Sequence, residues 1–91
     1  MLFMYVTSHT PERCLAGEAQ AQMKIMDPVR QNFMRAGIKV IALYSAPPEH
    51  TGWWVLEADD IIALHRALTP LIRWGNGRII PIEKVDFVVT Q

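Results

Sequence analysis

The segment that most constrains the fold is an aromatic, apolar run that ends in two acidic residues and leads directly into an apolar-periodic stretch. Residues 53–58 have the aromatic and apolar composition of a buried strand. Asp59 or Asp60 then supplies the N-cap of a helix. One face of that helix carries Ile61, Leu64, His65, Leu68, Leu71 and Ile72. The junction therefore predicts a strand that is followed at once by an amphipathic helix.

The start of the chain predicts a strand and a helix. Residues 2–7 are apolar on both alternating sets, which is typical of a strand buried on both faces. Thr10 is the expected N-cap of the next helix, and Pro11 is its first residue. The apolar stripe of this helix contains Leu15, Ala19, Met23 and Met26. Cys14 falls one turn inside the predicted helix.

A second helix start follows within the same region. Asp27 and Pro28 form another cap-and-proline pair, so the helix is expected to kink or restart there before it stops at Gly37. Residues 38–44 predict the second strand. Residues 45–52 contain two adjacent prolines and predict a rigid turn region before the aromatic run.

The last part of the chain predicts one more strand and completes the fold. Residues 75–77 (GNG) form the clearest turn, and residues 78–83 predict a fourth strand that Pro81 marks as an edge or bulged strand. The tail at 85–89 also has strand character. The expected order is strand, helix, strand, strand, helix, strand. This order predicts one α+β domain over residues 1–91, a ferredoxin-like βαββαβ plait with an antiparallel sheet.

The apolar content of the chain predicts a homodimer. A chain of 91 residues has a small core, yet 51% of its residues are hydrophobic. If the even-numbered residues of the first strand face the helices, Phe3, Tyr5 and Thr7 form a second face without a cover. Two protomers packed sheet to sheet would cover such a face and give a dimeric α+β barrel. The tail strand is expected to cross to the partner.

Charge and cysteine content exclude several classes of function. Nine basic and nine acidic residues cancel without a run of like charge, so we expect no nucleic-acid partner and no anionic membrane surface. No apolar run approaches the ~18 residues of a membrane span, and the start of the chain does not resemble a signal peptide. Cys14 is the single cysteine, which excludes an internal disulfide. These features favour a cytoplasmic location.

Three segments carry a resemblance to a known family. Residues 1–7, 52–60 and 79–82 resemble the first strand, the strand-to-helix junction and the final strand of a family of small uncharacterised bacterial proteins, defined as a domain of unknown function, in the dimeric α+β barrel superfamily. The chain departs from that pattern in a longer helical region at 23–37 and a prolonged last strand. The superfamily includes cofactor-free monooxygenases, isomerases, haem enzymes and binding proteins. The resemblance therefore implies a fold and not a function.

The predicted topology brings three loops to one end of the domain. They follow the first strand, join the second and third strands, and precede the fourth strand, and a site on a rigid scaffold is usually built from such loops. The candidate ligand-binding residues are His9, Tyr44, His50, Trp54, Asn76 and Arg78. The polar members could equally be solvated turn residues. The aromatic members could equally fill the core and the dimer interface, because neighbouring Trp53 and Trp54 point to opposite faces of their strand.

His65 is the candidate catalytic residue. Its helical phase places it beside Ile61, Leu68 and Ile72 and facing the sheet, where burial would lower its pKa and suit it to general base catalysis. The alternative is a histidine bonded to a backbone carbonyl. His9 and His50 are expected to approach one another, but no metal-ligand spacing is present in the sequence. We therefore predict no metal site and no cofactor.

Three functions remain open from the sequence. The protein could be a dimer that binds a small molecule between its helices and its sheet. It could be a cofactor-independent monooxygenase-like or isomerase-like enzyme that uses His65, with Trp54 or Tyr44 lining the pocket and Asn76 or Arg78 binding a carbonyl or an anion. It could also be an assembly module without a pocket. Whether the chain is an enzyme is left open by these residues.

Overall fold

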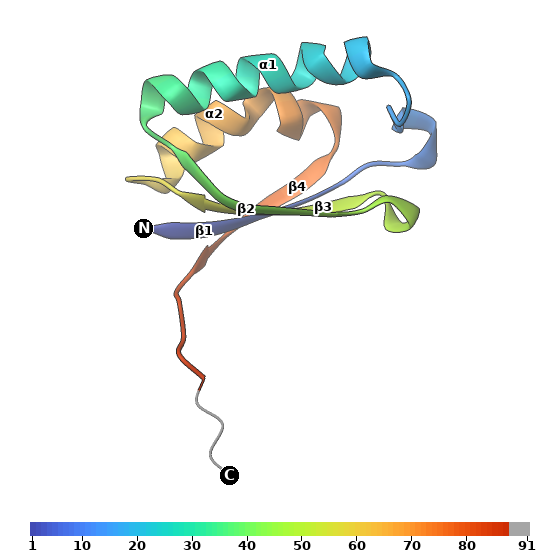
Figure 1. The fold of residues 1–91 in the computed structure, drawn as a ribbon. Coiled ribbons are helices and arrows are strands. Elements are labelled where there is room, and N and C mark those ends of the chain that lie inside the picture. Colours follow the sequence, from blue (N-terminus) through green and yellow to red (C-terminus); the bar gives the residue numbers. More distant parts are fainter. Residues whose placement is uncertain (88–91) are drawn as a thin grey trace.

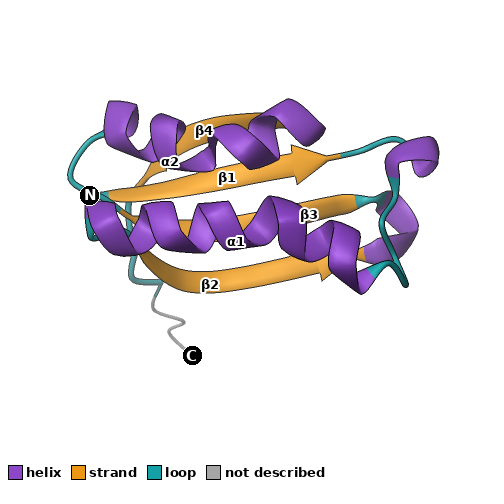
Figure 2. Ribbon diagram, turned by 90° about the horizontal axis from the view of Figure 1, so that it is seen from above, coloured by secondary structure: helices purple, strands orange, loops and turns teal. Residues whose placement is uncertain are grey.

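The computed structural model describes residues 1–87 and contains a four-stranded sheet with two helices on one face (Figure 1). In chain order the elements are β1 (Leu2–Ser8), η1 (Pro11–Arg13), α1 (Ala19–Ala36), β2 (Lys39–Ala46), η2 (Pro47–Glu49), β3 (Thr51–Glu57), α2 (Ile61–Trp74) and β4 (Asn76–Ile82). The strands lie in the order β2-β3-β1-β4 (Figure 2), and every neighbouring pair is antiparallel. This arrangement confirms the predicted ferredoxin-like α+β plait.

The core lies between the sheet and the helix layer. Phe3 and Tyr5 of β1 and Leu56 of β3 are fully buried beneath the helices. Trp54 meets Phe33 of α1 edge to face, with 6.2 Å between the ring centroids. The buried residues of the helices are Val29 and Phe33 on α1 and Leu64, Ala67, Leu68 and Leu71 on α2. The odd-numbered residues of β1 therefore face the helices and the even-numbered residues face away, the reverse of the arrangement considered from the sequence.

The opposite surface of the sheet is apolar and has no helix over it in the described part of the chain (Figure 1). Because directly paired residues share a face, the register of the strands identifies its members. Its apolar members are Met4, Val6, Tyr44, Trp53, Val55 and Ile80, which we call the helix-free face. Most of these side chains are half-buried by their neighbours, whereas Tyr44 is 67% exposed.

The first helix begins later than its capping signals predict. Thr10 makes no side-chain cap, and Pro11–Arg13 forms only a 3-10 turn that ends at an extended Cys14. Gly17 then adopts a left-handed conformation, with φ of 81°, which a continuous helix does not allow. Residues 14–18 are therefore a loop, and the prediction that Cys14 lies inside a helix is wrong.

The helix does not restart at Asp27 and Pro28 as predicted. It continues through both residues as one helix of 18 residues, α1. Asp27 is paired with Arg30, its carboxylate accepting a hydrogen bond of 2.7 Å, and does not cap a new helix. Pro28 and Lys24 are both exposed. Water can therefore satisfy the Lys24 carbonyl that Pro28 leaves without a donor. The predicted stop at Gly37 is confirmed by its left-handed conformation.

The end of α2 leads directly into the edge strand β4. The strand begins at Asn76, two residues before its predicted start, and Pro81 lies in an edge strand as expected. Gly77 is required because any Cβ there would collide with the Tyr5 ring and hydroxyl. Of the predicted tail strand, residues 85–87 have no regular structure, and residues 88 and 89 lie outside the described residues. Within residues 1–87, no helix is both long enough and apolar enough to cross a membrane.

The cap of α2 generates the first prediction. The Asp60 carboxylate accepts a 2.7 Å hydrogen bond from the Ala63 amide, which confirms the predicted cap. We expect Asp60→Ala to lower the free energy of unfolding by about 1 kcal/mol in urea denaturation. Asp59→Ala is the matched control, and its change is expected to stay within about 0.5 kcal/mol. Equal losses in the two variants would contradict the assignment of Asp60 as the cap.

Candidate functional site

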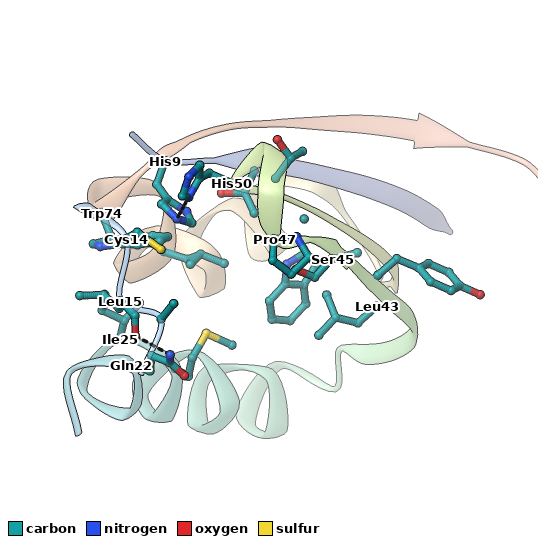
Figure 3. A pocket seen from close by; sticks show the side chains of 18 residues that line it. His9, Cys14, Leu15, Gln22, Ile25, Leu43, Ser45, Pro47, His50 and Trp74 are labelled. Carbon is teal, nitrogen blue, oxygen red and sulfur yellow. Dashed lines mark hydrogen bonds between the residues drawn. The ribbon is translucent and has the colours of Figure 1, made fainter. Parts of the chain in front are cut away.

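A pocket of about 550 Å³ opens between the helix layer and the end of the sheet where β1 finishes. Its walls are largely apolar, with Ile25 and Met26 from α1, Leu43 from β2, Trp54 from β3 and Leu71 from α2. A volume of this size lies within the ~300–1,000 Å³ of ordinary ligand pockets. Figure 3 shows that His9, His50 and Cys14 gather at one end of the pocket. The pocket thus has an apolar body and a polar end.

Two histidines from different loops meet at the polar end. His9 follows β1, and His50 lies in the tight connection between β2 and β3 with φ of 49°. The backbone amide of His9 donates to the carbonyl of His50 at 3.1 Å. Their rings are also in contact, with 3.2 Å between Nε2 of His9 and Nδ1 of His50. The expected approach of His9 and His50 is confirmed.

The environment of His9 favours its neutral form. Its ring also packs against Trp74, with 4.4 Å between centroids. Burial lowers the pKa of His9 below its ordinary value of 6.5, and the nearby charge of protonated His50 lowers this pKa further. Neutral imidazole nitrogens can accept a hydrogen bond or bind a metal ion.

Cys14 is the site residue that the sequence did not indicate. It is half-buried and lies in the pocket wall because residues 14–18 form a loop. The loop is tied down on both sides of the cysteine: Arg13 donates to the Trp74 carbonyl at 2.7 Å, and the Gln22 amide donates to the Leu15 carbonyl at 2.6 Å. No spacing signal links Cys14 to either histidine, so only the folded chain brings them together.

Two buried hydroxyl groups lie near the pocket. Thr7 lines the pocket and is 9% exposed, and Tyr5 is completely buried. Neither hydroxyl has a hydrogen-bond partner of ordinary geometry within the described residues. Burial raises the pKa of Tyr5, and the neighbouring Thr7 hydroxyl offsets part of the rise. A buried hydroxyl without a partner is unfavourable, so a polar ligand atom that reached Thr7 would remove part of this cost.

Four of the six predicted ligand-binding residues line the pocket, and two do not. His9, Tyr44, His50 and Trp54 belong to its wall. Asn76 and Arg78 are exposed and lie outside it. Their β1 partners, Ser8 and Val6, are even-numbered residues. Asn76 and Arg78 therefore point to the surface of the sheet away from the pocket.

The predicted burial of His65 is wrong. The buried face of α2 is formed by Leu64, Ala67, Leu68 and Leu71. His65 follows Leu64 by one residue, which turns its side chain by about 100° around the helix axis. It is exposed and does not line the pocket. The side chain therefore lacks the apolar surroundings on which its predicted role as a base depends.

The contact between the two histidines predicts a pH effect. By NMR titration, His9 is expected to have a pKa below 6.5, for the two causes given above. The stability contributed by neutral His9 is then complete above about 6.5 and is lost as the pH falls toward the folded-state pKa. His50→Gln should raise the pKa of His9, whereas the control His65→Gln should not change it. A His9 pKa at or above its ordinary value would contradict this interpretation.

The sequence itself identifies a family, although no curated protein matches it. Residues 1–88 match the family described as a domain of unknown function (DUF3303). The match spans nearly the whole chain and includes all of the helices and strands described above. The protein therefore belongs to the DUF3303 family.

Proposed function

We propose that the protein binds a small, largely apolar molecule in the pocket between its helices and its sheet. The observation that carries this proposal is the pocket itself: about 550 Å³ of space with apolar walls and a polar end, in a chain of 91 residues. A protein this small has little apolar surface to spare, so apolar walls left open to water are unfavourable unless a ligand covers them. The ligand class follows from the lining.

The lining favours a ligand with an aromatic or aliphatic body and one hydrogen-bonding group. Trp54 and Trp74 offer flat surfaces for a ring. Among the described residues that line the pocket there is no Asp, Glu, Lys or Arg. The polar group of the ligand therefore meets His9 and His50, which can donate or accept according to their tautomers. A carbonyl, a phenol or a weakly charged group suits this end of the pocket.

Binding is better supported than the two alternatives. The hypothesis of a monooxygenase-like or isomerase-like enzyme requires His65 to reach a substrate. His65 lies outside the pocket, on an exposed face of α2. The hypothesis of an assembly module does not require a pocket. The apolar walls and the polar end of the pocket are features that binding explains and assembly does not.

The binding proposal can be tested with anilinonaphthalene sulfonate, an apolar fluorescent probe with one anionic group. We expect saturable binding with NMR shifts centred on Thr7, Cys14 and Trp74. Leu43→Trp is expected to weaken binding by at least about tenfold, because the indole would occupy the volume that the probe needs. Met34→Trp is the control, since Met34 is 82% exposed and does not line the pocket. Equal binding by the two variants would overturn the proposal.

We also propose that the protein is a homodimer that packs through the helix-free face, as in a dimeric α+β barrel. The apolar character of that face supports a partner sheet as its cover. The tail adds support, because it leaves the sheet on the side opposite the helices (Figure 1) and carries the exposed residues Val85 and Phe87. A second copy offers an identical apolar face, which suits the two-fold symmetry of most dimers.

The dimer proposal is tested by sedimentation at micromolar concentration. The wild-type protein is expected to sediment as a dimer and Val55→Lys as a folded monomer, because Val55 pairs with Met4 and Ala42 in the middle of the helix-free face. Ile62→Lys is the matched control, since Ile62 is 62% exposed on α2. A monomeric wild-type protein would refute the proposal, as would a Val55→Lys variant that stays dimeric.

A further inference from the structure

Three potential metal ligands converge at the polar end of the pocket. They are His9 after β1, Cys14 in the loop before α1, and His50 between β2 and β3 (Figure 3). Each offers one ligand atom, and these atoms all lie within 4.8 Å of one another. All three side chains are half-buried, and all three line the pocket.

We propose that His9, Cys14 and His50 bind a zinc ion. The ligand atoms are Nε2 of His9, Nδ1 of His50 and Sγ of Cys14. The distance of 3.2 Å between the two nitrogens is close to the ~3.3 Å that separates two histidine nitrogens on a tetrahedral zinc ion. The Cys14 sulfur lies within 4.8 Å of both nitrogens, so it has to move closer as the ion binds. The two nitrogens therefore already have the spacing that zinc needs, while binding replaces their direct contact and draws the thiolate in.

The chemistry of the ligands selects the metal. Two imidazole nitrogens and one thiolate are typical of zinc and unlike the all-oxygen sets of calcium and magnesium. When zinc binds, the S–H bond of Cys14 is replaced by a Zn–S bond and the thiol proton passes to solvent. Three protein ligands leave the fourth position of a tetrahedral ion for water or for a donor atom of a molecule in the pocket. Such a site is open and not purely structural.

The surrounding contacts hold the three ligands in place before any ion arrives. The backbone hydrogen bond from His9 to His50 fixes the two histidine loops together. The packing of the His9 ring against the tilted Trp74 ring fixes one imidazole. Arg13, which donates to Trp74, ties the loop of Cys14 to the end of α2. Supporting contacts of this kind orient metal ligands and raise affinity.

A contact between two histidines could also be a simple hydrogen bond. That reading accounts for the 3.2 Å distance between the rings. It does not account for the convergence of Cys14, which comes from a third segment that is held in place on both sides. Zinc explains both observations.

The proposal is tested on the full chain, purified under reducing conditions and stripped of metal. We expect a single zinc ion per chain in competition with a chromophoric chelator. Cobalt as a probe is expected to give the absorption of a tetrahedral ion with a thiolate-to-metal charge-transfer band. Cys14→Ala should abolish that band and weaken zinc binding by more than ~100-fold, because loss of a ligand exceeds the effect of losing a supporting contact.

Two further variants make the outcome decisive. His50→Asn removes a ligand in a residue type that tolerates the left-handed conformation, and it is expected to weaken binding as Cys14→Ala does. His65→Ala removes an exposed histidine outside the cluster and should leave zinc affinity and the cobalt spectrum unchanged. Circular dichroism verifies the fold of each variant. The proposal fails if the wild-type protein binds no zinc in this competition, or if folded Cys14→Ala and His65→Ala bind it equally. Either result leaves the separate test with the fluorescent probe unaffected.

Discussion

Alternation along β1 is the constraint on which the rest of the structure depends. β1 lies between β3 and β4, so its side chains decide what each face of the sheet can do. Phe3, Tyr5 and Thr7 point under the helices: Phe3 and Tyr5 belong to the core, and Thr7 lines the pocket. Met4 and Val6 point to the helix-free face. A shift of register by one residue would exchange these two sets, removing the core and the pocket together.

The elements that could be predicted are those with local signals. Asp60 caps α2 and Gly37 ends α1, because each role depends on a few neighbouring residues. The late start of α1 could not be read from Thr10 and Pro11, since the 3-10 turn that they begin satisfies the same capping pattern. The path of the chain through Gly17 decides against a helix there, and that path depends on contacts with distant residues such as Trp74.

The candidate site was predictable in outline only. The topology of a ferredoxin-like plait brings the loops of His9 and His50 together, and this much followed from the order of the elements. The face that a strand residue occupies depends on the register of its pairing. Arg78 pairs with Val6 and therefore points to the face of the sheet away from the pocket. The helical phase of α2, which the sequence did not fix to within one residue, leaves His65 exposed. Cys14 could be placed only after the loop was known. Local patterns predict elements, but the members of a site depend on tertiary contacts.

Under the proposed binding function, the loop at 14–18 bears on how a ligand enters and leaves the pocket. It forms part of the rim and has no regular secondary structure. Two exposed side-chain hydrogen bonds, from Arg13 and from Gln22, hold it against the body of the domain. Bonds of this type contribute only about 0.5–1.5 kcal/mol each, far less than global unfolding requires. This part of the pocket wall can therefore open many times during one lifetime of the folded domain, and exchange of the ligand proposed for the pocket would not require the sheet to unfold.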